Sequence, residues 1–502
     1  MDASLQHSHP PDVSFDGGDL DCGGGLLLLI RRHIDPLPRG GLLEILSTES
    51  SVEGDLPAWC RLTGNQLVSW IKTGPQRRYL VCKGDLSERA RAPEPIRSAA
   101  PLARVKSVTI PDRLPAPSSA PAIEPLSVMG IGSWPRPRWM LQAVHEHLEG
   151  RLDETDFQAT ADDAVRLAVE AQLRAGVDVA TDGEQRRDSY ASFVGSRLDN
   201  CQLIPLTDLT AMVDDREKFE KELRALDVPA AEVRHPVVFG PLGRTQPLAV
   251  HEAAFVGQLT AKPVKVALPG PYLLTRTMWL DCLTDRPYQT RQDLARDVVR
   301  ILREELHFLL AAGVALVQFD EPVLTEVVFT GATGQRSFMC GALSEKKAPA
   351  QELAFATELL NAVVSGLPSG RVALHICRGN WTRDESAALR GDYRPLLSLL
   401  KSVNVGTLFL ELCTPRAGEM ELLREIPEDR RIGIGVVNQK QDHIETTDEI
   451  VAKVRRAIAL FGRERVLLTP DCGFATFADN PVNSAKVAEE KFAQVAKARA
   501  LL

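Results

Sequence analysis

The sequence predicts an α/β protein in which a (β/α)8 TIM barrel at residues 123–502 follows a small α+β unit at residues 12–83. After residue 122, short apolar runs rich in β-forming residues alternate with longer helical stretches. A strand followed by a helix, repeated eight times, indicates a parallel barrel. The eight runs begin near Ser127, Val177, Val264, Val314, Arg371, Thr407, Arg431 and Arg465.

Three other segments complete the predicted organisation. A further apolar run at residues 235–240 does not fit the count, and we expect it in a hairpin-like insertion after the second strand. Residues 84–122 mix Pro, Ala, Ser and Arg without a helical or strand period, which indicates a flexible interdomain linker. Residues 1–11 are polar, and we expect them to be a disordered tail.

Composition narrows the class of function. The chain has 502 residues and a net charge of −8, which argues against nucleic-acid binding because such proteins need a basic face. No apolar run approaches the roughly 18 residues of a membrane span, and the first residues do not resemble a secretory signal. Nine cysteines are an odd number in a long chain, so we expect mostly reduced thiols. We therefore expect a cytoplasmic protein that acts on a small molecule, with no nucleic-acid or membrane partner.

The segments that follow the predicted strands carry the candidate metal ligands. Barrel enzymes place their chemistry at the carboxyl ends of the strands. His375 and Cys377 lie two residues apart on one strand and point to the same face. Such a pair alone is more often ordinary packing, but Glu411 and Cys472 follow two other strands. Together they form a set of four zinc-type ligands around one mouth.

The charge of this ligand set favours one kind of zinc chemistry. Two thiolates and a carboxylate outweigh the dication by one charge, which suits activation of a thiol better than hydrolysis. A carboxylate ligand can also be exchanged for substrate. Cys413 lies two residues beyond Glu411 and either competes for the metal or serves as a small buried hydrophobe.

The whole set of strand ends resembles the catalytic barrel of the cobalamin-independent methionine synthase family, over about residues 126–502. The motifs that carry the resemblance are MGIGSWPRP, ATDGEQRRDSY, LPGPYLL, VQFDEPVL, LHICRGNW, LFLEL and LLTPDCGFAT. The resemblance implies Zn2+ as cofactor and homocysteine as the thiol substrate. It places His375, Cys377, Glu411 and Cys472 on the zinc ligands. It places Ile131, Ser133, Glu184 and Asp320 on the positions that bind the homocysteine amino and carboxyl groups.

Departures from the full-length family bear on the methyl donor. Long members have a second, N-terminal barrel that helps to bind folate, and residues 1–125 do not resemble it. The chain is closer to short members, which implies a non-folate donor such as a corrinoid methyl-donor protein. Long members place a histidine after strand seven where this chain has Lys440. Lys440 is accordingly either a general acid or a solvated lysine.

The small unit resembles the TusA-like sulfur-relay proteins in the segments DLDCGGGLLLLIRRHI and DLPAWCRLTG. Cys22 falls on the sulfur-carrying cysteine of that family, with Gly23 and Gly25 where family members have prolines. Cys22 precedes a predicted helix, whose dipole is expected to lower the thiol pKa and favour a persulfide. A cysteine desulfurase or other sulfur-relay protein is then a possible partner. A cysteine without chemistry, in a unit that aids oligomerisation or solubility, remains the alternative.

Three functions therefore stay open at this stage. The first is zinc-dependent methyl or alkyl transfer to a thiol, with homocysteine to methionine as the simplest case. The second is zinc-dependent sulfur transfer that uses a Cys22 persulfide. The third is a non-catalytic sulfur-delivery or thiol-binding protein.

Overall fold

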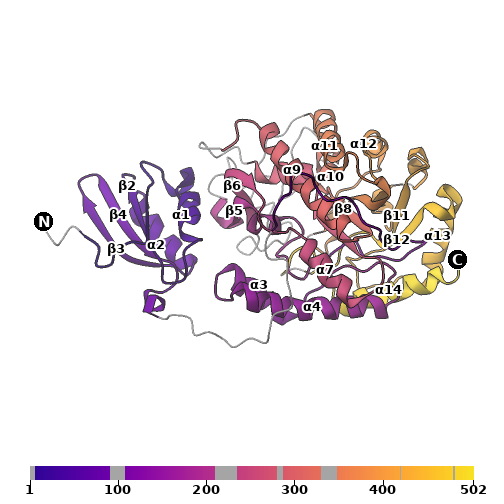
Figure 1. Ribbon diagram of the computed structural model, residues 1–502, viewed down its shortest axis with the longest axis horizontal. Helices are drawn as coiled ribbons and strands as arrows, with labels where there is room; N and C mark the ends of the chain where they lie inside the picture. The colour runs from indigo at the N-terminus through magenta and orange to yellow at the C-terminus, as the bar shows by residue number, and fades with distance from the viewer. Residues whose placement is uncertain are drawn as a thin grey trace.

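The computed structural model describes residues 6–90, 108–209, 234–279, 287–329, 348–380, 382–418, 420–478 and 481–502. It contains a small unit at residues 12–83 and a large unit at residues 126–502 (Figure 1). Among the described residues, no helix combines the length and apolar character needed to cross a membrane.

The large unit is built on a parallel sheet. Six strands pair in the order β12-β11-β10-β9-β8-β7, so every strand neighbours the next one in the chain. Their bounds are Lys265–Pro269 (β7), Leu316–Asp320 (β8), Val372–Ile376 (β9), Thr407–Leu410 (β10), Arg431–Val437 (β11) and Val466–Pro470 (β12). All of them are almost wholly buried and most of their residues are apolar, as expected of strands covered on both faces.

Isolated bridges close this sheet. Val128 pairs with Leu468 of β12, Met129 pairs with Val179, and Ala180 pairs with Val264, next to β7. The segments predicted as strands one and two therefore lie between β12 and β7, at the positions that an eight-stranded barrel requires. A second core inside the ring, which includes Met129, Val179 and Phe409, fills it with side chains.

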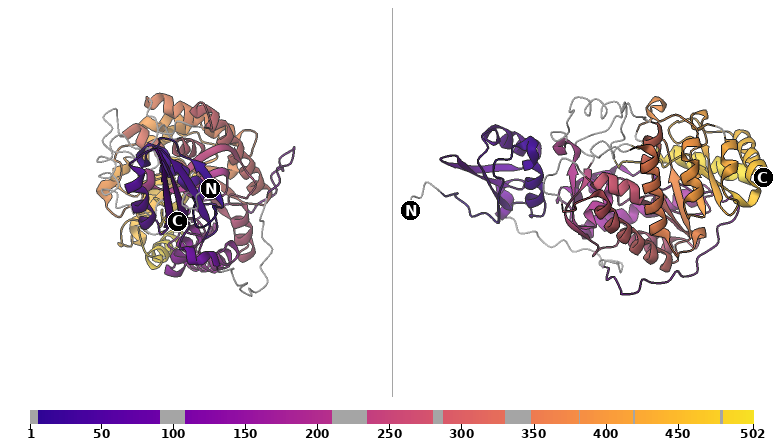
Figure 2. Two further views of the ribbon diagram at one scale, coloured as in Figure 1. Left: turned by 90° about the vertical axis from the view of Figure 1, so that its left-hand side faces the viewer. Right: turned by 90° about the horizontal axis from the view of Figure 1, so that it is seen from above.

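Helices lie around the outside of these strands (Figure 2). The longest are amphipathic and bury one face against the sheet, and two of them begin with a capping box, at Thr290 and Thr446. Their bounds are Arg138–Leu148 (α3), Glu154–Arg174 (α4), Leu206–Leu209 (α5), Val250–Leu259 (α7), Pro271–Met278 (α8), Arg291–Ala311 (α9), Val323–Phe329 (α10), Pro349–Val364 (α11), Leu397–Ser402 (α12), Thr447–Phe461 (α13) and Ala485–Arg499 (α14).

The expected insertion after the second strand is present. Asp199–Pro205 (β5) and Arg234–Gly243 (β6) form an antiparallel pair, and the segment at residues 235–240 belongs to β6. Because it follows the second strand position, the pair stands at the carboxyl end of the strands. That end of the large unit is called the mouth below.

The small unit has the predicted order of strand, helix, strand, helix and two strands. Its sheet has the order β1-β2-β4-β3, and its two helices pack against one face around Leu43, Trp59 and Tyr79. The bounds are Val13–Asp16 (β1), Leu27–Ile34 (α1), Leu42–Ser47 (β2), Val52–Leu62 (α2), Gln66–Thr73 (β3) and Gln76–Cys82 (β4).

The small unit stands over the mouth, with its helices between its own sheet and the β5–β6 pair (Figures 1 and 2). Arg31 of α1 forms a largely buried ion pair of 2.7 Å with Asp208, and the guanidinium of Arg32 lies over the Phe239 ring, 5.6 Å from its centre. Gln202 also donates a hydrogen bond of 3.2 Å to the Arg32 carbonyl. These contacts fix one orientation of α1 against the insertion.

Two expectations for the connecting segments need correction. Residues 108–122 are not a free linker, because the Ser118 carbonyl accepts a hydrogen bond from the Arg371 guanidinium and the Ser118 N–H donates one to the Leu310 carbonyl. Residues 91–107 and 1–5 lie outside the described residues. Part of the predicted disordered tail is ordered. The His7 ring is buried against the small sheet, and its Nδ1 lies 2.7 Å from Ser69 Oγ.

Candidate metal centre and substrate cavity

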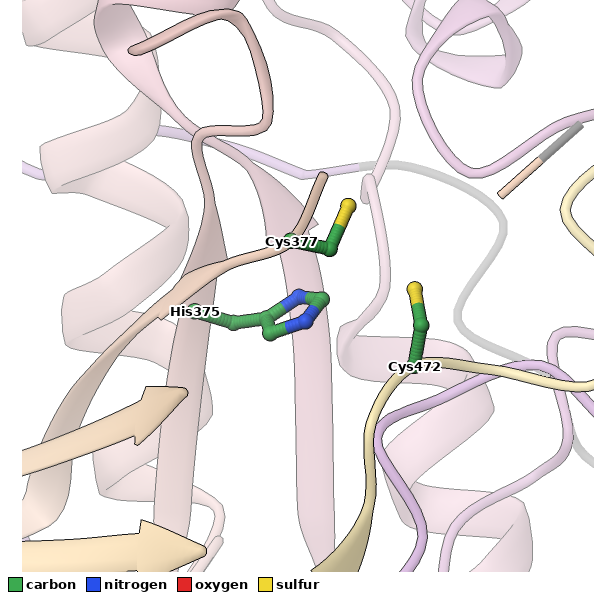
Figure 3. Close-up of side chains that lie close together, drawn as sticks. All are labelled: His375, Cys377 and Cys472. Atoms are coloured by element: carbon green, nitrogen blue, oxygen red, sulfur yellow. The ribbon is translucent and has the colours of Figure 1, made fainter. Parts of the chain in front are cut away.

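Three of the four predicted metal ligands meet at the mouth. His375 is near the end of β9, Cys377 directly follows it, and Cys472 lies two residues beyond β12. Their ligand atoms lie within 4.8 Å of one another, and all three side chains are buried (Figure 3). Parallel strands end at the same edge, so residues almost a hundred positions apart in the chain become neighbours.

The hydrogen bonds of His375 leave one nitrogen available for a metal. Its Nδ1 lies 2.8 Å from Asp320 Oδ1, whereas its Nε2 is buried and has no hydrogen-bond partner among the described residues. A metal-binding imidazole commonly donates its other N–H to a carboxylate in this way. One imidazole and two thiols are a donor set typical of zinc, so the residues present fit a metal ion.

The two thiols of the cluster affect each other's pKa. The Cys472 thiol and then the His375 ring stabilise the Cys377 thiolate, and they lower the pKa of Cys377 despite its burial. The pKa of Cys472 is raised, first by its hydrogen bond with Cys377 and then by burial. The pKa values of the two thiols therefore shift in opposite directions, as expected where one thiol donates a hydrogen bond to the other.

Glu411, the fourth predicted ligand, does not join this cluster. It follows β10 directly, as predicted, but its carboxylate pairs with Arg416 and accepts a hydrogen bond of 3.1 Å from the Arg378 backbone N–H. The prediction of four converging ligands is therefore correct for three side chains in this structure. The physical reason is that a buried carboxylate needs a partner, and Arg416 supplies one. Burial, and then Asp471, raise the pKa of Glu411 well above its usual value.

A small cavity of about 40 Å3 adjoins the cluster. It is lined by all four residues that were predicted to bind the substrate, together with the three clustered ligands, Tyr190 and Asn380. The predicted substrate residues are Ile131, Ser133, Glu184 and Asp320. The structure thus brings together seven of the eleven residues singled out in the sequence.

Three features of Glu184 suit the binding of a cation. Its backbone lies in the left-handed region, with φ of 55°, which a non-glycine residue adopts only where the surroundings impose it. Burial raises the pKa of its carboxyl to about 7, and the nearest cation, Arg187, is 3.9 Å away. Its Oε2 is buried without a hydrogen-bond partner among the described residues.

The other predicted residues lie outside the cavity. Lys440 is buried, which rules out the solvated alternative, and its Nζ donates a hydrogen bond of 2.9 Å to the Thr382 carbonyl. Burial lowers the pKa of Lys440, and Glu411 opposes this effect. Cys413 does not join the metal cluster either, because its Sγ lies 4.0 Å from Glu445 Oε1.

Cys22 contradicts the expected chemistry. It begins a short π-helical turn, Cys22–Leu26, before α1, but its thiol pKa is raised to about 12 instead of lowered. Burial is the largest cause, and the acidic neighbours Asp55 and Asp21 add to it. These effects outweigh the helix dipole. Cys22 faces a chamber of about 1320 Å3 between the units, which Arg186 and Asp188 of the large unit also line, and it does not line the metal cavity.

Three residues of the centre were missed in the sequence. Arg416 forms an ion pair with Glu411, Gln318 donates a hydrogen bond to Asp320, and Lys265 donates one to Gln318. Lys265 and Gln318 are polar residues inside apolar strand runs, and that signal could have marked them. No pattern in the sequence connects Arg416 to Glu411, because its position depends on the loop after β10.

The large unit is similar to known proteins. Residues 126–497 match the family described as "Cobalamin-independent synthase, Catalytic domain". A methionine synthase of Saccharolobus solfataricus is 26% identical over 344 residues, which cover 68% of this chain and 86% of the relative. One from Sulfurisphaera tokodaii is 27% identical over 344 residues, which cover 68% and 84%.

Solved structures show the same fold. A B12-independent methionine synthase from a Shewanella species, in complex with selenomethionine, has a TM-score of 0.57 at 23% identity, over 76% of this chain and 98% of that one. A putative vitamin-B12 independent methionine synthase from Listeria monocytogenes has a TM-score of 0.54 at 18% identity, over the same shares. Because the family match spans most of the chain, this protein belongs to the cobalamin-independent methionine synthase catalytic-domain family.

Proposed function

We propose that this protein uses a zinc ion to methylate a small thiol, with homocysteine as the acceptor and methionine as the product. The observation that carries the proposal is the buried cluster of His375, Cys377 and Cys472 at the mouth of a (β/α)8 barrel. The similarity of the chain to methionine synthases supports the choice of reaction.

Bound zinc would lower the pKa of the acceptor thiol and so keep its sulfur in the nucleophilic thiolate form at neutral pH. In the reaction the acceptor S–H bond breaks and its proton leaves to solvent. A new bond forms between sulfur and the methyl carbon, while the bond from that carbon to the donor breaks and the donor keeps the electron pair. His375, Cys377 and Cys472 would hold the metal, and Glu411 would be a fourth, exchangeable ligand that leaves Arg416 to bind.

The cavity residues would orient the amino acid end of the acceptor. Glu184 and Asp320 are buried carboxylates, which suit the ammonium group. Both hydrogen bonds of Asp320 end on its Oδ1, so Oδ2 is the oxygen that could face this group. Ser133 Oγ accepts a hydrogen bond from the Ala475 backbone, and its own O–H can donate to a substrate carboxylate. Ile131 would contribute the backbone of the same turn.

We further propose that the methyl donor is not a folate but a methylated corrinoid, either free or carried by a protein. The support is that the small unit is a four-stranded α+β fold and not a second barrel. With a corrinoid donor the cobalt keeps the electron pair and takes up no proton, so Lys440 would act as general acid only for a donor whose methyl group leaves from a nitrogen.

Two measurements test the proposal. Elemental analysis should find about one zinc per chain. A screen of donors and acceptors by mass spectrometry should detect methionine from homocysteine with a methylcorrinoid, and much less with methyltetrahydrofolate polyglutamate. An active preparation that contains no zinc, or folate turnover at about 1 per second or more, would overturn the proposal. No loss of thiol with or without a chelator would favour the non-catalytic alternative.

A second candidate is sulfur transfer from Cys22, and its support is the chamber that Cys22 shares with the loop after Glu184. The raised pKa of Cys22 opposes it, so the thiol would need a change in its surroundings before it could carry sulfur. The test is to incubate the protein with a cysteine desulfurase and cysteine beside a standard carrier. Peptide mass spectrometry should then find an adduct of about 32 Da on Cys22, one sulfur atom, and its absence would refute this candidate.

A further inference from the structure

Lys265, the first residue of β7, places its ammonium group inside the ring of strands beneath the metal centre. The side chain is 1% exposed. Its Nζ donates hydrogen bonds of 2.7 Å to the Ile131 carbonyl and 2.7 Å to Gln318 Oε1. It also lies 4.7 Å from the centre of the Phe409 ring, on a face that attracts cations.

Burial of an ammonium group is costly, so its contacts must compensate. Leu316 and Phe409 are among the apolar residues packed inside the ring, and Gln318 is the polar side chain that contacts Lys265 there. An apolar residue would fill this place without the cost of removing a charge from water. The contacts of Lys265 therefore point to a task beyond filling space.

A line of hydrogen bonds runs from Lys265 to the metal cluster. The Gln318 Nε2 donates a hydrogen bond of 2.7 Å to Asp320 Oδ1, and the same oxygen lies 2.8 Å from His375 Nδ1. Gln318 and Asp320 are two residues apart on β8, so both side chains point into the ring.

The donors and acceptors along this chain of hydrogen bonds follow one order. Lys265 Nζ donates to two oxygens, the Ile131 carbonyl and Gln318 Oε1, so the Gln318 amide presents its oxygen to Lys265 and its NH2 group to Asp320. Asp320 Oδ1 then accepts from Gln318 and from His375. Because His375 gives its Nδ1–H to Asp320, its Nε2 carries the lone pair that a metal needs.

Lys265 also acts on the other side of the cavity. Its hydrogen bond to the Ile131 carbonyl fixes the turn that contains Ser133. Its hydrogen bond to Gln318 fixes the amide that binds Asp320. One ammonium group thus connects the two walls of the cavity that were predicted to bind the two ends of the substrate amino acid.

We propose that Lys265 is a positioning residue, which fixes the orientation of Gln318 and thereby the geometry of Asp320 and His375 for metal binding. It acts through these residues and does not touch the metal or the substrate. The proposal rests on the proposed function, in that it assumes a metal at His375, Cys377 and Cys472.

The experiment compares zinc binding by the full-length wild type, Lys265→Met, Gln318→Leu and the double variant, by competition with a chromophoric chelator. Lys491→Met is the matched control, since Lys491 is also a fully buried lysine but bonds to the His443 carbonyl and Glu445, away from the cluster. Direct partners of a metal ligand change metal affinity by about 10–100-fold. Because Lys265 lies two further hydrogen bonds from Asp320, the direct partner of His375, we expect Lys265→Met to weaken zinc binding by at most about 10-fold, and Lys491→Met to leave it unchanged.

The double variant tests the line itself. If Lys265 acts through Gln318, the double variant should bind zinc about as well as the weaker single variant, and not worse by the product of the two effects. The visible spectrum of the cobalt-substituted proteins should change in Lys265→Met and not in Lys491→Met. Lys265→Arg, which keeps a donor, should recover part of the affinity.

Two results would overturn the proposal. One is a Lys265→Met protein that binds zinc as the wild type does and differs from Lys491→Met in no measurement. The other is full additivity in the double variant. A wild type that does not bind zinc would instead refute the proposed function, so the two failures are distinguishable.

Discussion

The thiols of the mouth and those of the small unit are equally hidden from water but differ in chemistry. Cys377 and Cys472 are buried beside each other and His375, and the pKa of Cys377 is lowered. Cys22 and Cys60 are also buried, yet the pKa of each is raised to about 12. Burial alone disfavours the thiolate form, whereas a hydrogen bond from a second thiol and a nearby imidazole stabilise it at Cys377.

Carboxylates differ between the regions in the same way. In the small unit, Glu53 and Glu88 are partly exposed and pair with arginines at the surface. At the mouth, Glu184 and Glu411 are buried, and burial raises the pKa of both. The mouth therefore contains buried carboxyl groups whose pKa values are raised, which is common where a protein binds or reacts.

The largest effect should come from removal of a clustered thiol. Cys472→Ser should lose tightly bound zinc and lower kcat/KM by about 1,000-fold or more, because three donors are needed to hold a catalytic metal. Cys60→Ser, which changes a buried thiol of the small unit, is the control. Retention of zinc by Cys472→Ser would remove the contrast between the two sets of thiols.

Removal of Arg416 should destabilise the metal-free protein more than the zinc-loaded protein. Arg416→Met leaves the Glu411 carboxylate buried without its cation, which typically costs about 3–5 kcal/mol. Thermal unfolding of metal-free and zinc-loaded protein should show a larger loss in the metal-free form, where zinc cannot replace Arg416 as partner of Glu411. Equal losses would contradict a role for Glu411 as ligand, and the Arg416→Met, Glu411→Gln double variant should restore stability.

The insertion between the two regions should be sensitive to acid. His235 of β6 is buried with its Nε2 2.5 Å from the Thr277 carbonyl, and burial lowers its pKa to about 4. The unfolded chain binds a proton near pH 6.5 and the folded one does not, so stability is present above pH 6.5 and is lost as the pH falls through about 4. The loss should approach about 3 kcal/mol, at about 1.4 kcal/mol per pH unit. Chemical unfolding at several pH values would measure it, and His235→Gln should flatten that part of the profile.

The smallest effect should follow Cys22→Ala. If methyl transfer needs only the mouth, kcat/KM should stay within about twofold of the wild type, as expected for a site without shared partners. A pKa raised from 9 to about 12 also implies a thiolate fraction about 1,000-fold lower, so iodoacetamide should label Cys22 slowly in the folded protein. A large fall in activity, or rapid labelling, would favour the sulfur-transfer candidate instead.

Much of the site could be predicted because function and fold share one pattern in this class of protein. Parallel strands end at one edge, so the residues after the apolar runs were expected to meet, and His375, Cys377, Cys472, Glu184 and Asp320 do so. Spacing along a strand gave the shared face of His375 and Cys377. These predictions needed only the period of a strand and the order of the elements.

By itself, the sequence determined the order of elements in both units, the insertion after the second strand, and the residue types at the mouth. Only the tertiary structure decided that Glu411 faces Arg416, that Lys265 reaches Asp320 through Gln318, and that the Cys22 thiol has a raised pKa. The physical reason is that apolar periodicity is a local property of the chain. The partner and the pKa of a buried polar group depend instead on distances to residues that are far away in sequence.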